Sequence, residues 1–169
     1  EVEQGGGQAL AYGCNVLEKK ELEDCCSAIH QAWGGVDILI NGAGGNDPRG
    51  TTSDEFMEQS RRDRPDGQTL FDLDVNGFRQ VFDLNFLGTF LAVQVFSQSM
   101  VRRGSGSIVN MSSMSALTPL TKVAAYSAAK AAVSNFTRWL AVHFSRTGVR
   151  VNALAPGFFM TEQLRFLHV

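Results

Sequence analysis

Four residues in the second half of the chain have the types and spacing needed to move a proton. Tyr126 and Lys130 stand four positions apart in a predicted helix, so both side chains project from one face of it. Ser112 and Ser113 follow an apolar run and place two hydroxyl groups shortly before that helix. A phenol beside an ammonium group, opposite a hydroxyl, is suited to general acid–base chemistry.

Each of these groups also has a purely structural interpretation. Serine is common in turns after strands, a tyrosine can be a core aromatic with a bonded hydroxyl, and a helix lysine is usually solvated. Asn85, a polar residue inside an apolar helical stretch, could simply satisfy a backbone group. The combination of these groups in one chain favours the catalytic interpretation.

The elements that must position these groups alternate between strand and helix. Apolar and β-branched runs predict strands at residues 9–14, 36–40, 108–111 and 149–155. Helical periodicity predicts long helices at residues 18–33, 77–103 and 123–145, with short ones at residues 54–60 and from Met160. Without a hairpin signal, this order predicts an α/β fold with a doubly wound parallel sheet and helices on both faces.

Small or polar residues follow three of the predicted strands, at residues 41–45, 112–115 and 156–161. Since parallel strands end at one edge of the sheet, we expect the three clusters to share one ligand crevice. Residues 46–75 are polar and longer than an ordinary connection, which predicts a surface insertion within a single domain over residues 1–169.

The composition limits the kinds of partner that we expect the chain to bind. The 169 residues are 44% hydrophobic with a net charge of −2, which gives no reason to expect nucleic acid or a membrane. No apolar run reaches the roughly 18 residues of a membrane span. Cys14, Cys25 and Cys26 fit neither a disulfide framework nor a zinc pattern. We expect buried or half-buried thiols, no metal site and a cytoplasmic location.

Five motifs, in order and spacing, resemble the short-chain dehydrogenase/reductase family. They are Asn41-Gly42-Ala43-Gly44, Asn85, the serine pair, Tyr126-x-x-x-Lys130, and Asn152 followed by Pro156-Gly157 and Thr161. The resemblance implies a Rossmann-like fold. It also implies hydride transfer between NAD or NADP, with NAD weakly favoured, and a hydroxyl or keto group of a small molecule.

The resemblance also implies residue roles. Tyr126 would exchange a proton with the substrate oxygen, and Lys130 would favour its phenolate form and hold the nicotinamide ribose. Ser113, with Ser112 as the alternative, would orient that oxygen, and Asn85 would hold a water that relays protons to Lys130. Cofactor contacts are implied at Asn15, Val16, Asn41, Ala43, Gly44, Met111, Tyr126, Lys130, Pro156, Gly157, Phe159 and Thr161.

A narrower resemblance concerns the substrate and the assembly. The runs around residues 41–48, 82–90 and 155–167 resemble a branch of the family that interconverts a keto sugar acid and its hydroxy acid, of the mannonate and fructuronate type. Arg49, Arg165 or the arginines of the insertion could bind the carboxylate. The family resemblance further implies a homodimer or homotetramer formed through helices 77–103 and 123–145.

The chain departs from the family pattern at both ends. It matches neither the Gly-rich phosphate turn and first two strands of the family fold nor its last strand. The resemblance therefore implies an interior part of a longer enzyme, which could be inactive by itself. Two alternatives stay open, a catalytically silent family member that serves as an oligomerisation or binding module, and a small α/β ligand-binding module without redox chemistry.

Overall fold

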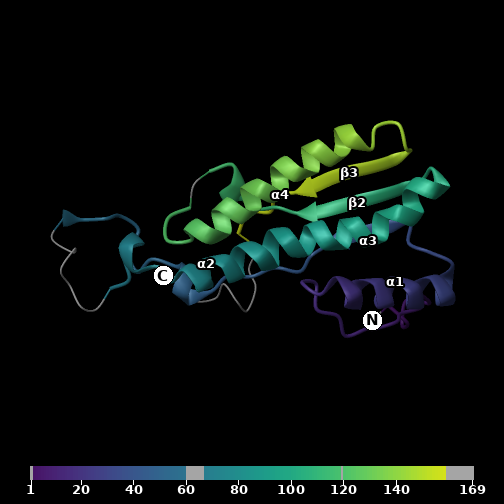
Figure 1. Cartoon of the computed structure of the whole chain (residues 1–169), viewed down its shortest axis with the longest axis horizontal. Helices are drawn as coiled ribbons and strands as arrows, with labels where there is room; N and C mark the ends of the chain where they lie inside the picture. The colour runs from purple at the N-terminus through teal and green to yellow at the C-terminus, as the bar shows by residue number, and fades with distance from the viewer. Residues whose placement is uncertain (1, 60–66, 119, 159–169) are drawn as a thin grey trace.

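The computed structural model describes residues 2–59, 67–118 and 120–158, and these include a three-stranded parallel sheet (Figure 1). Its strands lie in chain order, β1 (Ile38–Asn41), β2 (Gly106–Met111) and β3 (Val149–Leu154). The register places Asn41 beside Asn110 and Met111 beside Leu154. The parallel sheet and the strands expected at residues 36–40, 108–111 and 149–155 are confirmed.

The described residues also form four α-helices, at the places that the periodicity predicts. They are α1 (Lys19–Trp33), α2 (Val75–Phe82), α3 (Gly88–Arg103) and α4 (Ala124–His143). Local chemistry sets several of their ends. The Asp74 carboxylate caps α2 by accepting a hydrogen bond of 2.6 Å from the Gly77 amide, and α1 and α3 end at Gly34 and Gly104, whose φ angles are 78° and 69°.

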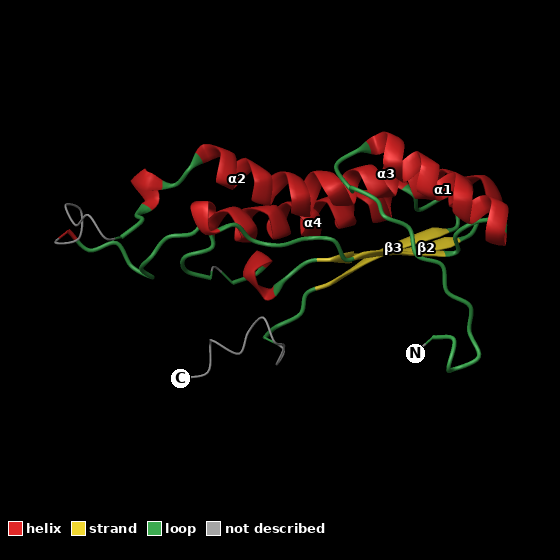
Figure 2. Ribbon diagram, turned by 90° about the horizontal axis from the view of Figure 1, so that it is seen from below, coloured by secondary structure: helices red, strands yellow, loops and turns green. Residues whose placement is uncertain are grey.

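The helices α1, α3 and α4 lie on one face of the sheet (Figure 2), so the prediction of helices on both faces is wrong for the described residues. The chain moves from β1 to β2 to β3 in one direction, and right-handed crossovers in one direction place their helices on one face. On β1, Leu39 packs towards the helices while its neighbours Ile38 and Ile40 are 63% and 65% exposed.

The core lies between the sheet and these helices, in two apolar clusters. One joins α3 and α4 to the strands, and its buried members are Val93, Met100, Ile108, Leu140, Val149 and Val151. The other packs α1 against α3 through Leu22, Ala92, Val95 and Phe96. Cys14, Cys25 and Cys26 are half-buried free thiols at the edge of the second cluster, as expected.

Two predicted elements are absent from the described residues. Residues 9–14 are not a strand, because no described strand lies beside them to supply hydrogen-bond partners. Apolar composition alone is therefore not enough to make this segment a strand. Residues 54–56 form bends and residues 57–58 have no regular structure, so the expected helix at 54–60 does not form there. The short helix expected from Met160 lies outside the described residues.

A π turn over Asp83–Leu87 joins α2 to α3 without interrupting the helix. The expected helix over residues 77–103 is thus continuous, but its change of pitch was not predicted. Wider pitch displaces backbone groups from their usual partners. Here the Asn85 side-chain amide donates to the Val81 carbonyl at 2.7 Å, and the Thr89 hydroxyl donates to the Asn85 carbonyl at 2.9 Å. Both carbonyls are therefore satisfied.

This continuous helix, Val75–Arg103, is long and apolar enough by composition to cross a membrane. However, 56% of its most apolar stretch is buried inside the protein. Its buried residues pack against the sheet and against α1, as in the core helix of a globular domain. The helix is therefore weak evidence for a membrane segment.

The connection between β1 and α2 extends away from the sheet (Figure 1). Its described parts contain two short 3₁₀ helices, Pro48–Gly50 and Leu70–Asp72. The Thr52 amide donates to the Lys122 carbonyl at 3.0 Å, which fixes the connection to the loop before α4. That this connection is an insertion in a single domain stays a prediction.

Candidate active site

The helix α4 brings Tyr126 and Lys130 to the carboxyl end of β2. The Lys130 ammonium nitrogen lies 2.8 Å from the carbonyl oxygen of Met111, the last residue of that strand. It also lies 5.5 Å from the centre of the Tyr126 ring. Tyr126 is half-buried, whereas Lys130 is only 5% exposed. A phenol and a buried cation thus meet at the strand edge, as the spacing predicts.

Burial lowers the pKa of the Lys130 ammonium from its ordinary value of 10.5. The cause is desolvation, since a charge is less stable away from water. The Met111 carbonyl offsets part of this cost by accepting a charge-assisted hydrogen bond. The cation is therefore fixed in place rather than free in solvent.

Asn85 connects this pair to the loop after β1. Its side-chain nitrogen donates to the Gly45 carbonyl at 2.7 Å, and its side-chain oxygen accepts from the Gly45 amide at 3.3 Å. The backbone approaches so closely that a Cβ on Gly44 would lie 2.5 Å from the Asn85 oxygen and 3.4 Å from the Lys130 nitrogen. The π turn, the glycine loop and α4 therefore meet at one point.

The two serines have different surroundings. The Ser112 hydroxyl oxygen lies 2.5 Å from that of Ser134 and 3.3 Å from the Lys130 carbonyl, so it ties β2 to α4. The Ser113 hydroxyl accepts from the Ser115 amide at 3.2 Å, and within the described residues it donates no hydrogen bond. The Ser113 proton is thus the one available to a substrate oxygen.

Several of the residues expected to contact a cofactor lie at the same end of the sheet. Asn41 is buried at the end of β1, and Gly42, Ala43 and Gly44 follow it with exposed backbone. The Pro156 carbonyl accepts from the Met114 amide at 3.0 Å, which brings the segment after β3 next to the segment after β2. Gly157 is exposed beside Met114, whereas Phe159 and Thr161 lie outside the described residues.

Asn15 and Val16 lie further out, at the start of α1. The Asn15 amide donates to the Glu21 carboxylate at 2.7 Å, which holds the turn before the helix. Val16 packs against Gly88, where an added Cβ would lie 2.8 Å from a Val16 methyl carbon. Gly88 follows the π turn by one residue. This contact attaches the Asn15–Val16 segment to the helix that carries Asn85.

Comparison with known proteins identifies the family. The sequence pattern of the short chain dehydrogenase family matches residues 1–167. The chain belongs to the short chain dehydrogenases. The described sheet and helices are therefore part of the Rossmann-like α/β fold of this family, as the sequence motifs predict.

Individual relatives agree with this assignment. An uncharacterized oxidoreductase of Bacillus subtilis is 51% identical over 163 residues, which are 96% of this chain and 57% of the relative. A solved NAD-bound structure from Haemophilus, provisionally named as a D-mannonate oxidoreductase, has 50% identity and a TM-score of 0.91, covering 98% of this chain and 58% of that chain. The 5-keto-D-gluconate 5-reductase of Escherichia coli is 32% identical over 164 residues, or 97% of this chain and 57% of the relative. The chain thus spans little more than half the length of these short chain dehydrogenases.

Arg49, one of the expected carboxylate-binding residues, already has partners. Its guanidinium donates to both oxygens of Asp47, at 3.0 and 2.7 Å, and to the Gln80 side chain at 2.6 Å. The paired guanidinium lowers the pKa of the Asp47 carboxyl. Arg49 is therefore committed to holding its own loop. Arg165 and the insertion's Arg61, Arg62 and Arg64 lie outside the described residues.

Sequence reasoning missed two residues next to the predicted site, the buried Asn110 and Thr137, which join β2 to α4. Gly45, which holds the Asn85 side chain, belongs to the expected cluster at residues 41–45. Asn110 carries a recognisable signal, a single polar side chain inside the apolar run 108–111. Thr137 gives no such signal, because threonine is ordinary in a helix of small residues.

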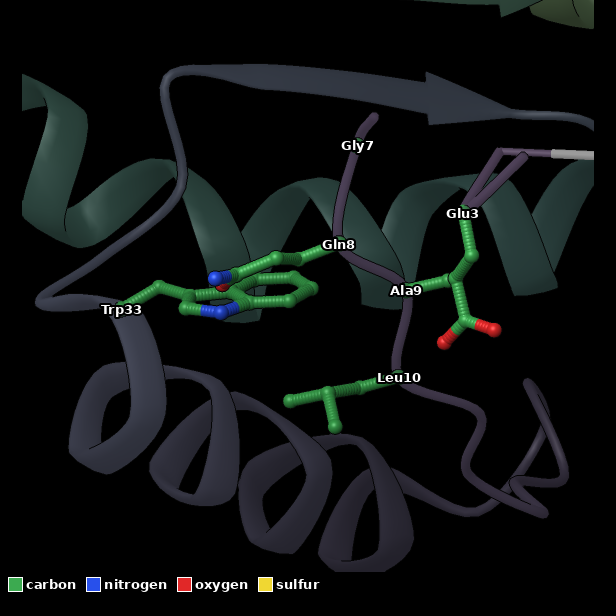
Figure 3. A pocket seen from close by; sticks show the side chains of 6 residues that line it. All are labelled: Glu3, Gly7, Gln8, Ala9, Leu10 and Trp33. Atoms are coloured by element: carbon green, nitrogen blue, oxygen red, sulfur yellow. The ribbon is translucent and has the colours of Figure 1, made fainter. Parts of the chain in front are cut away.

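A separate surface hollow lies beside the C-terminal end of α1 (Figure 3). Glu3, Gly7, Gln8, Ala9, Leu10 and Trp33 line it. None of them is among the residues that the family resemblance assigns to catalysis or cofactor binding.

Replacing Gly44 with alanine is expected to disturb this short chain dehydrogenase site. The added Cβ would overlap the buried Asn85 amide, and overpacking of this kind costs about 1–3 kcal/mol of unfolding free energy. Urea denaturation of Gly44→Ala would measure that loss. Gly42→Ala is the matched control, since its Cβ would meet no atom within 4 Å. Equal stabilities of the two variants would contradict the close contact.

Proposed function

We propose that this chain forms the acid–base part of an NAD(P)-dependent oxidoreductase that interconverts a hydroxyl and a keto group of a sugar acid. The observation that carries the proposal is the placement of the Lys130 ammonium, 2.8 Å from the Met111 carbonyl and 5.5 Å from the Tyr126 ring. That geometry places a fixed positive charge beside a phenol at the ligand edge of a parallel sheet.

Proton transfer falls to Tyr126 in this proposal. Its phenol gives a proton to the substrate oxygen during reduction and takes one during oxidation. The Lys130 cation stabilises the phenolate that reduction leaves behind. Ser113, whose proton is not used within the described residues, donates to the same substrate oxygen and fixes its direction.

The side chain of Asn85 is less available to hold a water than the family resemblance implies. Its side-chain amide is occupied by Gly45 and Val81. The backbone carbonyl of Asn85 is a second acceptor of this residue, and within the described residues the side chain that donates to it is Thr89. We infer that a proton-relaying water would bind this carbonyl rather than the side chain.

The residues around the edge fit a nicotinamide dinucleotide. Gly42, Ala43 and Gly44 offer exposed backbone, and a Cβ on Gly42 would meet nothing within 4 Å, so a flat ligand can approach there. Asn15 and Val16 would lie on the adenine side, and Met111, Lys130, Pro156 and Gly157 on the nicotinamide side. When bound, the nicotinamide supplies or accepts the hydride. We favour NAD, because the similar Haemophilus structure holds NAD.

The substrate class rests on two relatives. The Haemophilus structure is provisionally named for D-mannonate, and the Escherichia coli relative for 5-keto-D-gluconate. Both names describe sugar acids. Monitoring NADH absorbance with the protein, NAD and D-mannonate tests this proposal, with mannitol as the control that lacks a carboxylate. Equal rates with both compounds would reject the sugar-acid class, and no turnover with any hydroxy compound would favour a catalytically silent binding module.

We also propose that two copies associate through α3 and α4, and that the protein works in the cytoplasm. On α4 the Trp139 ring, 55% exposed, stacks between Phe136 and His143 at centroid distances of 6.2 and 4.6 Å. Val142 beside it is 74% exposed. An apolar and aromatic row of this kind is suited to a second copy of the same helix.

Trp139→Glu is expected to lower the oligomeric state, because a carboxylate would be buried at this interface without a partner. Sedimentation velocity would show a loss of at least half the mass. Trp33→Glu is the matched control, since Trp33 is the only other tryptophan, is 49% exposed and lies on α1. A monomeric wild-type protein, or an unchanged mass for Trp139→Glu, would contradict the interface.

A further inference from the structure

A row of buried polar contacts joins α4 to β2 directly beside the Lys130 side chain. Asn110 is fully buried, and its side-chain nitrogen donates to the Thr137 hydroxyl at 2.9 Å. Its side-chain oxygen accepts from the Asn41 amide of β1 at 2.8 Å. Ser112 meets Ser134 on the same helix. We call the five residues Asn41, Asn110, Ser112, Ser134 and Thr137 the polar seam.

The polar seam lies at the end of an interface between β2 and α4 that is otherwise apolar. Nearer the start of β2, this strand and α4 pack through Ile108 and Leu140 in the apolar core cluster. Hydrogen-bonded side chains replace apolar ones only over the last residues of the strand, next to Met111. Buried polar groups require partners, so a helix that rotates or slides would leave several of them unpaired. The seam therefore permits one position of α4 against the strand end.

That position is the one that places the Lys130 nitrogen. Lys130, Ser134 and Thr137 are four and seven residues apart, so they share one face of α4. Their partners are Met111, Ser112 and Asn110, three consecutive residues of the chain. The Ser112 hydroxyl also contacts the Lys130 carbonyl at 3.3 Å. The ammonium and the seam are thus held by the same short segment.

We propose that Asn110 and Thr137, together with the Ser112–Ser134 pair, are positioning residues that hold the Lys130 ammonium against the Met111 carbonyl. They touch neither substrate nor reacting atoms. Their effect on turnover rests on the function proposed above, whereas their effect on the Lys130 ammonium does not. The two effects can therefore be tested separately.

The test compares Thr137→Val with Thr137→Ser. Valine keeps the shape of threonine but removes the hydroxyl that Asn110 needs, while serine keeps the hydroxyl. The probe is a pH titration followed by NMR of ¹³Cε-labelled lysine, which is simple because the chain has four lysines, Lys19, Lys20, Lys122 and Lys130. Released from the Met111 carbonyl, the ammonium loses an acceptor that favours its charged form, but it also becomes more solvated. Because desolvation is what lowers its pKa, we expect its titration midpoint to rise towards the ordinary 10.5.

We expect that rise in Thr137→Val and not in Thr137→Ser. With an active protein, kcat should fall about tenfold in Thr137→Val at a KM within about twofold of wild type. Ser99→Ala is the control for losing a buried hydroxyl, since Ser99 bonds only its own helix at Phe96 among the described residues. A lower melting temperature with an unchanged Lys130 midpoint would overturn the proposal, because the seam would then be structural only.

Ser134→Ala keeps the test decisive if Thr137→Val does not fold. It removes the Ser134 hydroxyl at a half-buried position, so the Ser112 hydroxyl loses this partner. A rise of the Lys130 midpoint supports the proposal, and no change overturns it. If wild-type protein shows no turnover, the proposed function fails while the lysine titration still decides the role of the seam.

Discussion

Tyr126→Phe is expected to lower kcat about a thousandfold, the largest effect on turnover that any single substitution in this chain should have. Only the phenolic oxygen is lost, so the ring still packs beside the Lys130 ammonium at its present distance of 5.5 Å. Without that oxygen, the group proposed to give a proton to the substrate oxygen and to take one from it is missing. Steady-state rates of NADH formation would measure the loss.

Tyr12→Phe is the matched control for this substitution, because Tyr12 is the only other tyrosine and is 44% exposed before α1. Its rate should stay within about twofold of wild type, as for most exposed substitutions. Similar rates for Tyr126→Phe and wild type would remove Tyr126 from the mechanism. Wild-type protein that binds NADH but never turns over would instead favour a ligand-binding module.

Lys130→Met should have the second largest effect, a fall in kcat of about a hundredfold, because a fixed charge next to the developing phenolate is lost. Methionine retains most of the apolar stem that the buried lysine packs with its neighbours. The substitution therefore removes the charge with little change of volume. Turnover measured beside the unfolding free energy separates the chemical loss from a structural one.

Comparison with Lys130→Met also tests how the free energy of unfolding depends on pH. Burial lowers the pKa of Lys130 in the folded protein below 10.5, the value expected in the unfolded chain. Between these two values the unfolded state binds more protons, so the free energy of unfolding of the wild type rises with pH. Below the lowered pKa, the cost of burying the charge is fully present. Urea denaturation across this alkaline window should show the wild type gaining stability relative to Lys130→Met, and parallel curves would contradict a buried ammonium.

Much of the fold could be predicted because the relevant signals are local. The β-branched run Val36–Ile40 and the helical period of residues 18–33 depend on a few neighbouring side chains. The prediction of a strand at residues 9–14 is wrong for the opposite reason. A strand exists only when another strand pairs with it, and composition carries no information about that partner. Within the described residues helices cover one face only, because the crossover direction, rather than helix count, decides which face is covered.

In the candidate site, too, some features follow from local patterns in the sequence and others depend on contacts between distant residues. Tyr126 and Lys130 share a face by spacing alone, and both occur together at the strand end. The family resemblance implies Ser113, with Ser112 as the alternative, whereas only the structure shows that Ser112 contacts Ser134 of α4 and that Ser113 accepts from the Ser115 amide. The pairing of Asn110 with Thr137 joins residues far apart in the chain. No local pattern could reveal that contact, and none revealed the π turn at Asn85.

The π turn at Asp83–Leu87 also constrains how the chain can vary in length. A residue added to an α-helix, or removed from it, rotates everything beyond it by about 100°. With the π turn in place, Val81 of α2 and Val93 of α3 are both buried, although the two segments pack on different neighbours. A deletion between Asn85 and Gly88 would turn one of these surfaces towards solvent. Insertions and deletions among relatives should therefore gather in the exposed connection after β1 and spare these five residues.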